Sequence, residues 1–292
     1  MAWHPTWNEP PERRRRIMMG GGGTFPPGVK MVLLVTLAVF VVDLFTRGAL
    51  SRYGSLSVRH LLGFEVWRLF TYMFLHGSFG HIFINMFIFW MIGMTLERQL
   101  GTRRFLYLYF AAGLVGGLLE VAFNVIMHVE HGPIQTPQGM LTFLDIPAVG
   151  ASAGVAGVMV AFATINPRAI FLLFFFLPIQ ARWLAIIYMI IETRHMLIGL
   201  QTGWTDGVAH AAHVGGMIVG FVWVKWGHRI AEAVKNGRPR RDRGPFFSRG
   251  RNRDREELDR ILDKIHREGV GSLSTREKMF LQEMGGKFRD GP

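Results

Sequence analysis

Long apolar runs alternate with short polar or basic segments along most of the chain. Because an α-helix rises about 1.5 Å per residue, about 20 apolar residues are needed to cross the ~30 Å of hydrocarbon in a bilayer. We therefore expect transmembrane helices near residues 29–46, 80–96, 104–127, 148–165, 183–199 and 207–226. One further apolar run, residues 169–177, ends at Pro178 and is roughly half the length needed. We place this run at the cytoplasmic surface, between the fourth and fifth helices.

The basic residues predict the orientation of these spans. With six spans, most Arg and Lys residues near the helix ends fall on one side, which is the pattern of cytoplasmic loops. These residues are arginines 13–16, Arg98, Arg103, Arg104, Arg168, Arg182, Lys225 and Arg229. Those that depart from the rule, in the first outer loop, are Arg47, Arg52, Arg59 and Arg68. We expect both termini in the cytoplasm, and we attribute the formal net charge of +12 to this asymmetry rather than to nucleic-acid binding.

Composition divides the chain into four expected parts. These are a basic cytoplasmic segment at 1–28, a six-helix membrane domain at 29–227, an Arg-rich linker at 228–255 and a small cytosolic helical hairpin at 256–292. The linker is expected to be mobile or to touch anionic lipid. In the last part, Ser274 and Glu277 have the spacing of a capping box that begins a helix. The first apolar run is longer than the core of a secretory signal, and no A-x-A site follows it, so we expect it to be retained.

Polar residues inside the apolar runs are the candidates for chemistry. The chain has no cysteine, which excludes disulfides, a cysteine nucleophile and a cysteine-ligated metal. An ionisable or strongly hydrogen-bonding group in a membrane helix is costly unless it faces a cavity or a partner. The four that stand out are His81, Asn85, Ser152 and His213. His81 and Asn85 lie four residues apart on one helix face, where their alternative role is only to join helices.

The two candidates for nucleophilic catalysis lie among small residues. Ser152 stands in the sequence GASAG, between Gly150 and Gly154. Small neighbours leave its hydroxyl accessible, although the same pattern also occurs where helices merely pack closely. His213 shares a helical stripe with Gly216, which predicts a close helix contact at the imidazole.

His210, three residues before His213, leaves two alternatives open. It could be the base in place of His213, or the two could bind a metal ion as an i, i+3 pair. Neither a paired carboxylate nor a third ligand is evident, so we expect no metal and no cofactor.

Ser152 and His213 are expected at the same depth in the membrane. If their helices run inward from about residues 148 and 207, the two residues lie roughly 6 and 9 Å below the outer helix ends. His81 falls in the same layer, and Asn85 lies one turn deeper.

Together these motifs resemble the rhomboid intramembrane serine proteases. The segment EVWRLFTYMFLHGSFGHIFINMFIFWMIGMTLERQLG resembles the family's first loop and second helix, GASAG its nucleophile motif and AHVGG its base motif. The resemblance covers about residues 65–220. It implies a six-helix bundle with the fourth helix at the centre and a water-filled cavity open to the outside.

The resemblance also implies a chemistry. The family works as a Ser–His dyad, in which His213 would take the proton of Ser152 as the serine attacks a peptide carbonyl and forms an acyl-enzyme. His81, Asn85 and the backbone N–H of Ser152 would supply the oxyanion hole. The residues that would support the site are Gly150, Gly154 and His210. Those that match the family pattern in structural roles are Trp67, Arg68 and Glu97.

One position departs from the family's pattern, and three polar residues need another interpretation. Many members have an aromatic residue one helical turn after the serine, where it stacks on the base, whereas this chain has Ala156. Another group must then orient the base. We expect Glu120 and Asn124 to hydrogen-bond within the bundle rather than act in catalysis, and Asp206 to cap the sixth helix.

The expected partners are transmembrane proteins as substrates, cut near their outer ends where small or helix-breaking residues let the backbone unwind, together with membrane lipids. We expect a multi-pass protein of a bacterial inner membrane, because the C-terminal sequence resembles the tail of a subset of bacterial rhomboids. The sequence does not predict an oligomeric state. The alternative is a catalytically inactive rhomboid-like adaptor that binds transmembrane clients, but an intact Ser152 and His213 favours the protease. A channel or transporter predicts inverted repeats, and none is evident.

Overall fold

The computed structural model describes residues 25–136, 139–173, 177–237 and 245–289. The chain divides into two compact units, Met1–Glu232 and Ala233–Pro292. Most of the expected basic segment at 1–28 lies outside the described residues.

The first unit is built from long apolar helices. They are α2 (Pro27–Phe45), α6 (Phe79–Leu100), α7 (Thr102–His131), α8 (Ser152–Ile165), α9 (Ala181–Thr202) and α10 (His210–Gly237), which extends beyond the unit boundary. Within the described residues, α2, α6, α7 and α9 are long and apolar enough to cross a membrane, whereas α8 has 14 residues. The protein is therefore a helical, multi-pass membrane protein. The count of six spans and the cytoplasmic termini remain predictions.

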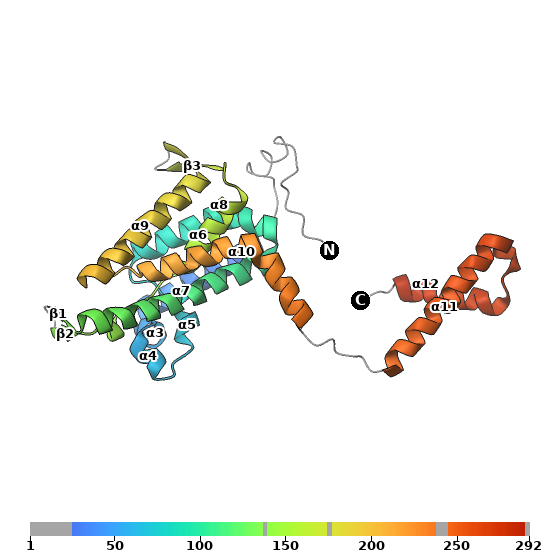
Figure 1. The fold of residues 1–292 in the computed structure, drawn as a ribbon, viewed down its shortest axis with the longest axis horizontal. Helices are drawn as coiled ribbons and strands as arrows, with labels where there is room; N and C mark the ends of the chain where they lie inside the picture. The colour runs from blue at the N-terminus through green and yellow to red at the C-terminus, as the bar shows by residue number, and fades with distance from the viewer. Residues whose placement is uncertain (1–24, 137–138, 174–176, 238–244, 290–292) are drawn as a thin grey trace. The chain divides into compact units, whose positions relative to one another are not determined.

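Helix α8 forms the centre of this unit. All of its residues from Ala153 to Ala163 are buried, and it packs against α6, α7 and α9 (Figure 1). Its small side chains make this possible, because a Cβ added at Gly157 would lie 2.4 Å from the side chain of Ala112 on α7 and 2.8 Å from the carbonyl oxygen of Gly216 on α10. The central position implied for the fourth helix is therefore the one observed.

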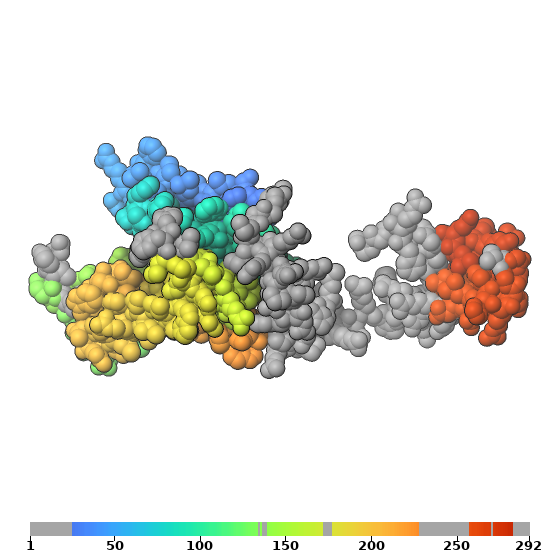
Figure 2. Space-filling model, turned by 90° about the horizontal axis from the view of Figure 1, so that it is seen from above, coloured from blue at the N-terminus to red at the C-terminus, as the bar shows by residue number. Residues whose placement is uncertain are grey.

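The outer surface of the unit is apolar. Figure 2 shows α9, in yellow to orange, covering much of one face. Large hydrophobic side chains of α9 are exposed there, among them Trp183, Ile186, Ile187 and Ile190. Such a surface is unfavourable in water and suits contact with lipid tails.

A compact segment of short helices precedes α6. It consists of α3 (Ala49–Gly54), α4 (Val58–Leu62), α5 (Arg68–Thr71) and the 3-10 helix η2 (Tyr72–Phe74). The buried guanidinium of Arg68 donates to the carbonyl oxygens of Arg52 and Ser55 at 2.9 and 2.8 Å, and the Trp67 indole donates to that of Tyr53 at 3.2 Å. Trp67 and Arg68 thus hold this segment together.

Glu97 joins two helices. Its carboxylate accepts the first N–H groups of α2, from Gly28 at 2.8 Å and Val29 at 2.7 Å, and a bond from the Thr102 hydroxyl at 2.6 Å. A carboxylate at a helix N-terminus satisfies otherwise unpaired donors and complements the helix dipole. The expected structural role of Glu97 agrees with these contacts.

Two small antiparallel hairpins connect the longer helices. Strands β1 (Ile134–Thr136) and β2 (Gly139–Leu141), followed by the 3-10 helix η3 (Phe143–Asp145), link α7 to α8. Strands β3 (Ile170–Leu173) and β4 (Leu177–Gln180) link α8 to α9, with Ile170 paired to Gln180. In the half-length apolar run at 169–177, the described residues 170–173 and 177 lie in strands.

In the second unit, after the end of α10, the described residues form α11 (Pro245–Glu268) and α12 (Thr275–Arg289), joined by the 3-10 helix η4 (Val270–Ser272). The predicted capping box is confirmed: the Ser274 N–H donates to Glu277 at 2.8 Å, and the Glu277 N–H donates to the Ser274 hydroxyl at 3.3 Å.

Much of the expected linker at 228–255 is helical where the structure describes it, and its boundaries stay a prediction. Helix α10 continues to Gly237 and α11 begins at Pro245, so only residues 238–244 lie between described helices, and they fall outside the described residues. Arginine has a favourable helix propensity, so a run rich in arginine need not interrupt a helix.

Candidate active site

Ser152 is the first residue of α8, not a residue one turn inside it. The expected start near residue 148 was wrong because Ala148 is held in an extended bridge to Leu56. Between the bridge and the helix the chain turns at Gly150, whose φ of 132° favours glycine. The turn brings the serine to the N-terminal end of a buried helix, where backbone N–H groups have no helical partner.

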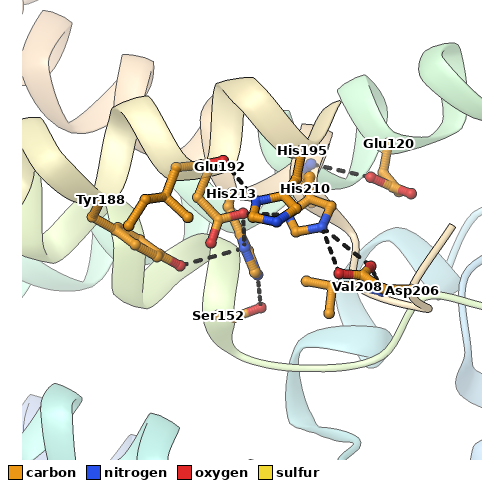
Figure 3. Close-up of polar contacts among 11 residues, drawn as sticks. Glu120, Ser152, Tyr188, Glu192, His195, Asp206, Val208, His210 and His213 are labelled. Carbon is orange, nitrogen blue, oxygen red and sulfur yellow. Dashed lines mark hydrogen bonds and ion pairs between the residues drawn. The ribbon is translucent and has the colours of Figure 1, made fainter. Parts of the chain in front are cut away.

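His213 reaches the serine from the first turn of α10, which begins at His210 rather than near residue 207. Its Nε2 lies 2.7 Å from the Ser152 hydroxyl oxygen (Figure 3). The close contact expected at this stripe is present, because a Cβ at Gly216 would overlap the carbonyl oxygen of Ala153. The absence of a side chain at that position lets the two helices approach closely enough for the pair to meet.

His81 and Asn85 lie on α6, which begins two residues before His81 and is capped by the Ser78 hydroxyl at 3.1 Å from the His81 N–H. A Cβ added at Gly150 would lie 2.9 Å from the imidazole of His81 and 3.5 Å from the Ser152 hydroxyl oxygen, so both side chains border this glycine. The Asn85 amide donates to the His81 carbonyl oxygen at 3.0 Å. His81, Ser152 and His213 thus stand in the first turns of three helices, whose positive dipole ends favour negative charge.

Sequence reasoning missed His76, which lies in the short loop before α6. It is buried, and its Nε2 is 3.5 Å from the backbone N of Ala151, the residue before the nucleophile candidate. Its ring meets that of His81 edge-on with 4.9 Å between centroids. Burial and the neighbouring His81 lower the pKa of His76 from 6.5 to about 4, so the ring is neutral near pH 7. The HGSFGH segment could have indicated the pair.

Sequence reasoning also missed Glu192, a buried carboxylate on α9. Its Oε2 lies 2.9 Å from Nδ1 of His213 and 2.6 Å from Nδ1 of His210 (Figure 3). The Tyr188 hydroxyl is 3.3 Å from the same His213 nitrogen. The rule that selected the other four residues, an ionisable or strongly hydrogen-bonding group within an apolar helix, applies equally to Glu192.

His210 does not contact the serine, so the geometry favours His213 as the base candidate. The Nε2 of His210 faces Asp206, with its two carboxylate oxygens at 3.1 and 3.2 Å. We expected Asp206 to cap α10, and this was wrong. Its carboxylate accepts the Val208 N–H at 3.0 Å, and Val208 lies before the helix begins. Burial would raise the pKa of Asp206, but the Val208 N–H and His210 hold that pKa below its usual range.

The remaining sequence candidates support the packing. A Cβ at Gly154 would lie 2.6 Å from the Tyr109 ring, so the glycine allows α7 to approach. Glu120 accepts from the Asn124 amide at 3.0 Å and from the Ala212 N–H at 3.2 Å. The expectation that Glu120 and Asn124 hydrogen-bond within the bundle is confirmed.

Three of these groups could also hold a metal ion. One ligand atom each from Glu192, His210 and His213 lies within 4.8 Å of the others. Two histidines and a carboxylate are a donor set that Zn²⁺ accepts. The expectation of a metal-free site therefore stays a prediction.

Comparison with known proteins matches a rhomboid domain to residues 63–229 and a family of unknown function (DUF6576) to residues 247–287. The chain is 29% identical over 168 residues to Rhomboid protein 1, mitochondrial, of Saccharomyces cerevisiae, covering 58% of this chain and 43% of the yeast protein. It is 26% identical over 204 residues to RHOMBOID-like protein 12, mitochondrial, of Arabidopsis thaliana, covering 66% and 56%. It is 27% identical over 160 residues to Rhomboid protease GluP of Bacillus subtilis, covering 54% and 25%. The chain thus spans from a quarter to just over half the length of these relatives.

Proposed function

Because the chain belongs to the rhomboid family, whose domain matches residues 63–229, we propose that it is an intramembrane serine endopeptidase. It cuts transmembrane segments of other membrane proteins, with Ser152 as nucleophile and His213 as general base. The observation that carries the proposal is the 2.7 Å separation between the Ser152 hydroxyl oxygen and Nε2 of His213. This is within the distance that proton transfer to a general base requires.

The reaction follows from this pair. As the Ser152 oxygen bonds to the substrate's carbonyl carbon, its proton passes to Nε2 of His213. His213 then gives that proton to the leaving amine when the C–N bond breaks, which leaves an acyl ester on the serine. A water molecule attacks the ester, His213 takes the water's proton, and the serine regains a proton when the acid product leaves.

The negative charge of each tetrahedral intermediate needs donors that are already oriented. The N–H groups at the start of α8, together with His81 and Asn85, are the groups we assign to this role. The Asn85 amide has a second N–H besides the one that bonds to the His81 carbonyl. A fixed donor at this point acts mainly on the transition state.

Substrates are transmembrane helices that can unwind near their outer ends. In an intact helix the carbonyl groups are hydrogen-bonded and shielded, so small or helix-breaking residues at the cut site favour the reaction. We place the protein in a bacterial inner membrane with six spans and both termini in the cytoplasm. The positive-inside distribution of its basic residues supports this orientation.

The test is labelling of the detergent-purified full-length protein by a serine-reactive fluorophosphonate. We expect labelling of the wild type, none of Ser152→Ala, and labelling at the wild-type level of Ser272→Ala, which removes a hydroxyl in the second unit. Labelling that persists in Ser152→Ala would refute the nucleophile. A folded wild type that is neither labelled nor able to cut transmembrane substrates would favour the inactive adaptor.

A further inference from the structure

Glu192 is a carboxylate in a helix otherwise suited to lipid. It follows Ile190 and Ile191, whose side chains are exposed, yet Glu192 itself is only 6% exposed. A buried carboxylate is unfavourable unless strong donors satisfy it. The donors that face it include the ring nitrogens of His210 and His213, and the Tyr188 hydroxyl also hydrogen-bonds to it.

The carboxylate determines which nitrogen of His213 carries the proton. An ionised carboxylate only accepts hydrogen bonds, so Nδ1 of His213, 2.9 Å from Oε2, must carry the hydrogen. The lone pair of the neutral ring is then on Nε2, which faces the Ser152 hydroxyl at 2.7 Å. This is the tautomer that can accept the serine's proton. In the other tautomer, the Nδ1 lone pair would face the carboxylate and the base would have no free lone pair toward the serine.

His210 fixes the carboxylate from the opposite side. Its Nδ1 contacts the same Oε2 at 2.6 Å, its Nε2 contacts Asp206, and its ring stacks on that of His195 with 5.0 Å between centroids. With a carboxylate at each ring nitrogen, a doubly protonated His210 can donate to both. Its position therefore restricts the Glu192 side chain to the rotamer that meets His213.

We propose that Glu192 is a positioning residue for the Ser152–His213 pair, and that His210 holds its carboxylate in place. The proposal rests on the proposed protease function and replaces a dyad by a Ser–His–Glu arrangement. Glu192 thereby orients the base, a role that an aromatic residue at the position of Ala156 has in many family members. In this chain the orienting group comes from α9 instead. When His213 accepts the proton, the carboxylate also stabilises the cationic ring.

The same atoms offer a competing role as metal ligands. The ligand atoms of Glu192, His210 and His213 lie within 4.8 Å of one another. A metal on Nδ1 of His213 would leave the hydrogen of the neutral ring on Nε2, where the ring has no lone pair for the serine's proton. The two roles are therefore mutually exclusive, and a chelator distinguishes them.

The experiment measures cleavage of a transmembrane peptide substrate by the full-length protein in liposomes, with and without EDTA. We expect Glu192→Gln, which keeps the shape but removes the charge, to lower kcat about 100-fold or more with KM nearly unchanged. Glu192→Asp should recover part of the activity. The matched control is Glu120→Gln. Glu120 is also a buried carboxylate and accepts the Ala212 N–H of α10, but its variant should keep kcat within about three-fold of the wild type.

Each outcome decides a different point. If the wild type does not cut the substrate, or if cutting persists in Ser152→Ala, the proposed function is contradicted. An active wild type together with a Glu192→Gln variant of similar kcat overturns the positioning role, and so does loss of wild-type activity in EDTA. If Glu192→Gln does not fold, the ¹⁵N NMR signals of the His213 ring in the wild type decide: a hydrogen on Nδ1 supports the proposal, and one on Nε2 overturns it.

Discussion

At the residue scale, the chemistry depends on side chains that meet across large separations in sequence. Ser152 and His213 were predicted because each stands in a short motif with small neighbours. Glu192 lies 21 residues before His213, and no local pattern connects the two. What the sequence does contain is a carboxylate within an apolar run. The carboxylate of Glu192 meets His213 only in the folded protein, where α9 and α10 bring the two side chains together.

Asn85 offers a residue-scale test of the oxyanion hole. If it donates to the developing oxyanion, Asn85→Ala should lower kcat about 100-fold, or about 3 kcal/mol, with little change in KM. The control on the same helix is Gln99→Ala, whose amide bonds to Asn166 at 3.1 Å at the exposed end of α6. A kcat for Asn85→Ala within three-fold of the Gln99→Ala value would remove Asn85 from the site.

His76 predicts a dependence of stability on pH. The pKa of a histidine with an ordinary value of 6.5 is lowered in the folded protein to about 4 by burial and by His81, whose ring meets it edge-on. The unfolded state then binds more protons between pH 6.5 and pH 4, so stability falls as the pH is lowered through this window. Protonation also removes the acceptor for the Ala151 N–H. The full effect is about 3 kcal/mol at 1.36 kcal/mol per pH unit.

The measurement for His76 is the thermal unfolding midpoint in detergent between pH 7 and pH 4. His76→Asn retains an acceptor for the Ala151 N–H but does not titrate, so its midpoint should fall several degrees less than that of the wild type. Parallel curves for the two proteins would contradict the prediction.

At the element scale, the apolar runs predicted where helices occur better than where they begin. Each of the six expected segments contains a helix, but α8 and α10 begin three or four residues later than expected. Hydropathy does not distinguish an extended apolar stretch from the first turn of a helix. The β3–β4 hairpin was not predicted for a similar reason, because a short apolar run is compatible with either strand or helix.

The contact between α8 and α10 predicts a strong effect of a small substitution. A Cβ at Gly220 would overlap the carbonyl oxygen of Gly157, and backbone atoms cannot move without shifting a helix. We expect Gly220→Ala to destabilise the protein by about 2 kcal/mol and to lower activity by separating Ser152 from His213. The measurements are the unfolding midpoint and the rate of fluorophosphonate labelling.

The matched control for that substitution is on the same helix. The nearest atoms to a Cβ at Gly227 belong to Trp223 at 3.9 Å, an ordinary contact. Because alanine favours the helix more than glycine, Gly227→Ala should leave the midpoint unchanged or raise it slightly. Equal losses in the two variants would mean that the effect does not come from helix packing.

At the scale of the whole molecule, the number of membrane crossings depends on α8. Its 14 residues are about 21 Å long, less than the ~30 Å of hydrocarbon, yet nearly all of them are buried in protein. A helix that contacts other helices rather than lipid need not span the full thickness, because backbone polar groups beside it can be satisfied by protein or by water in a cavity. We therefore predict that α8 crosses the membrane; with α10 as well, the four helices that are long and apolar enough to cross become the six expected crossings.

This count predicts that sites before α8 and after α10 lie on opposite sides of the membrane, because three crossings separate them. The chain has no cysteine, so single cysteines can be introduced without background labelling. Met140→Cys, at an exposed position in β2, should react with an impermeant maleimide in intact spheroplasts, and Ser272→Cys in the second unit should react only after permeabilisation. The unaltered chain is the control. If both cysteines reacted from the same side, an even number of helices would cross between them, and α8 would be the first crossing to reconsider.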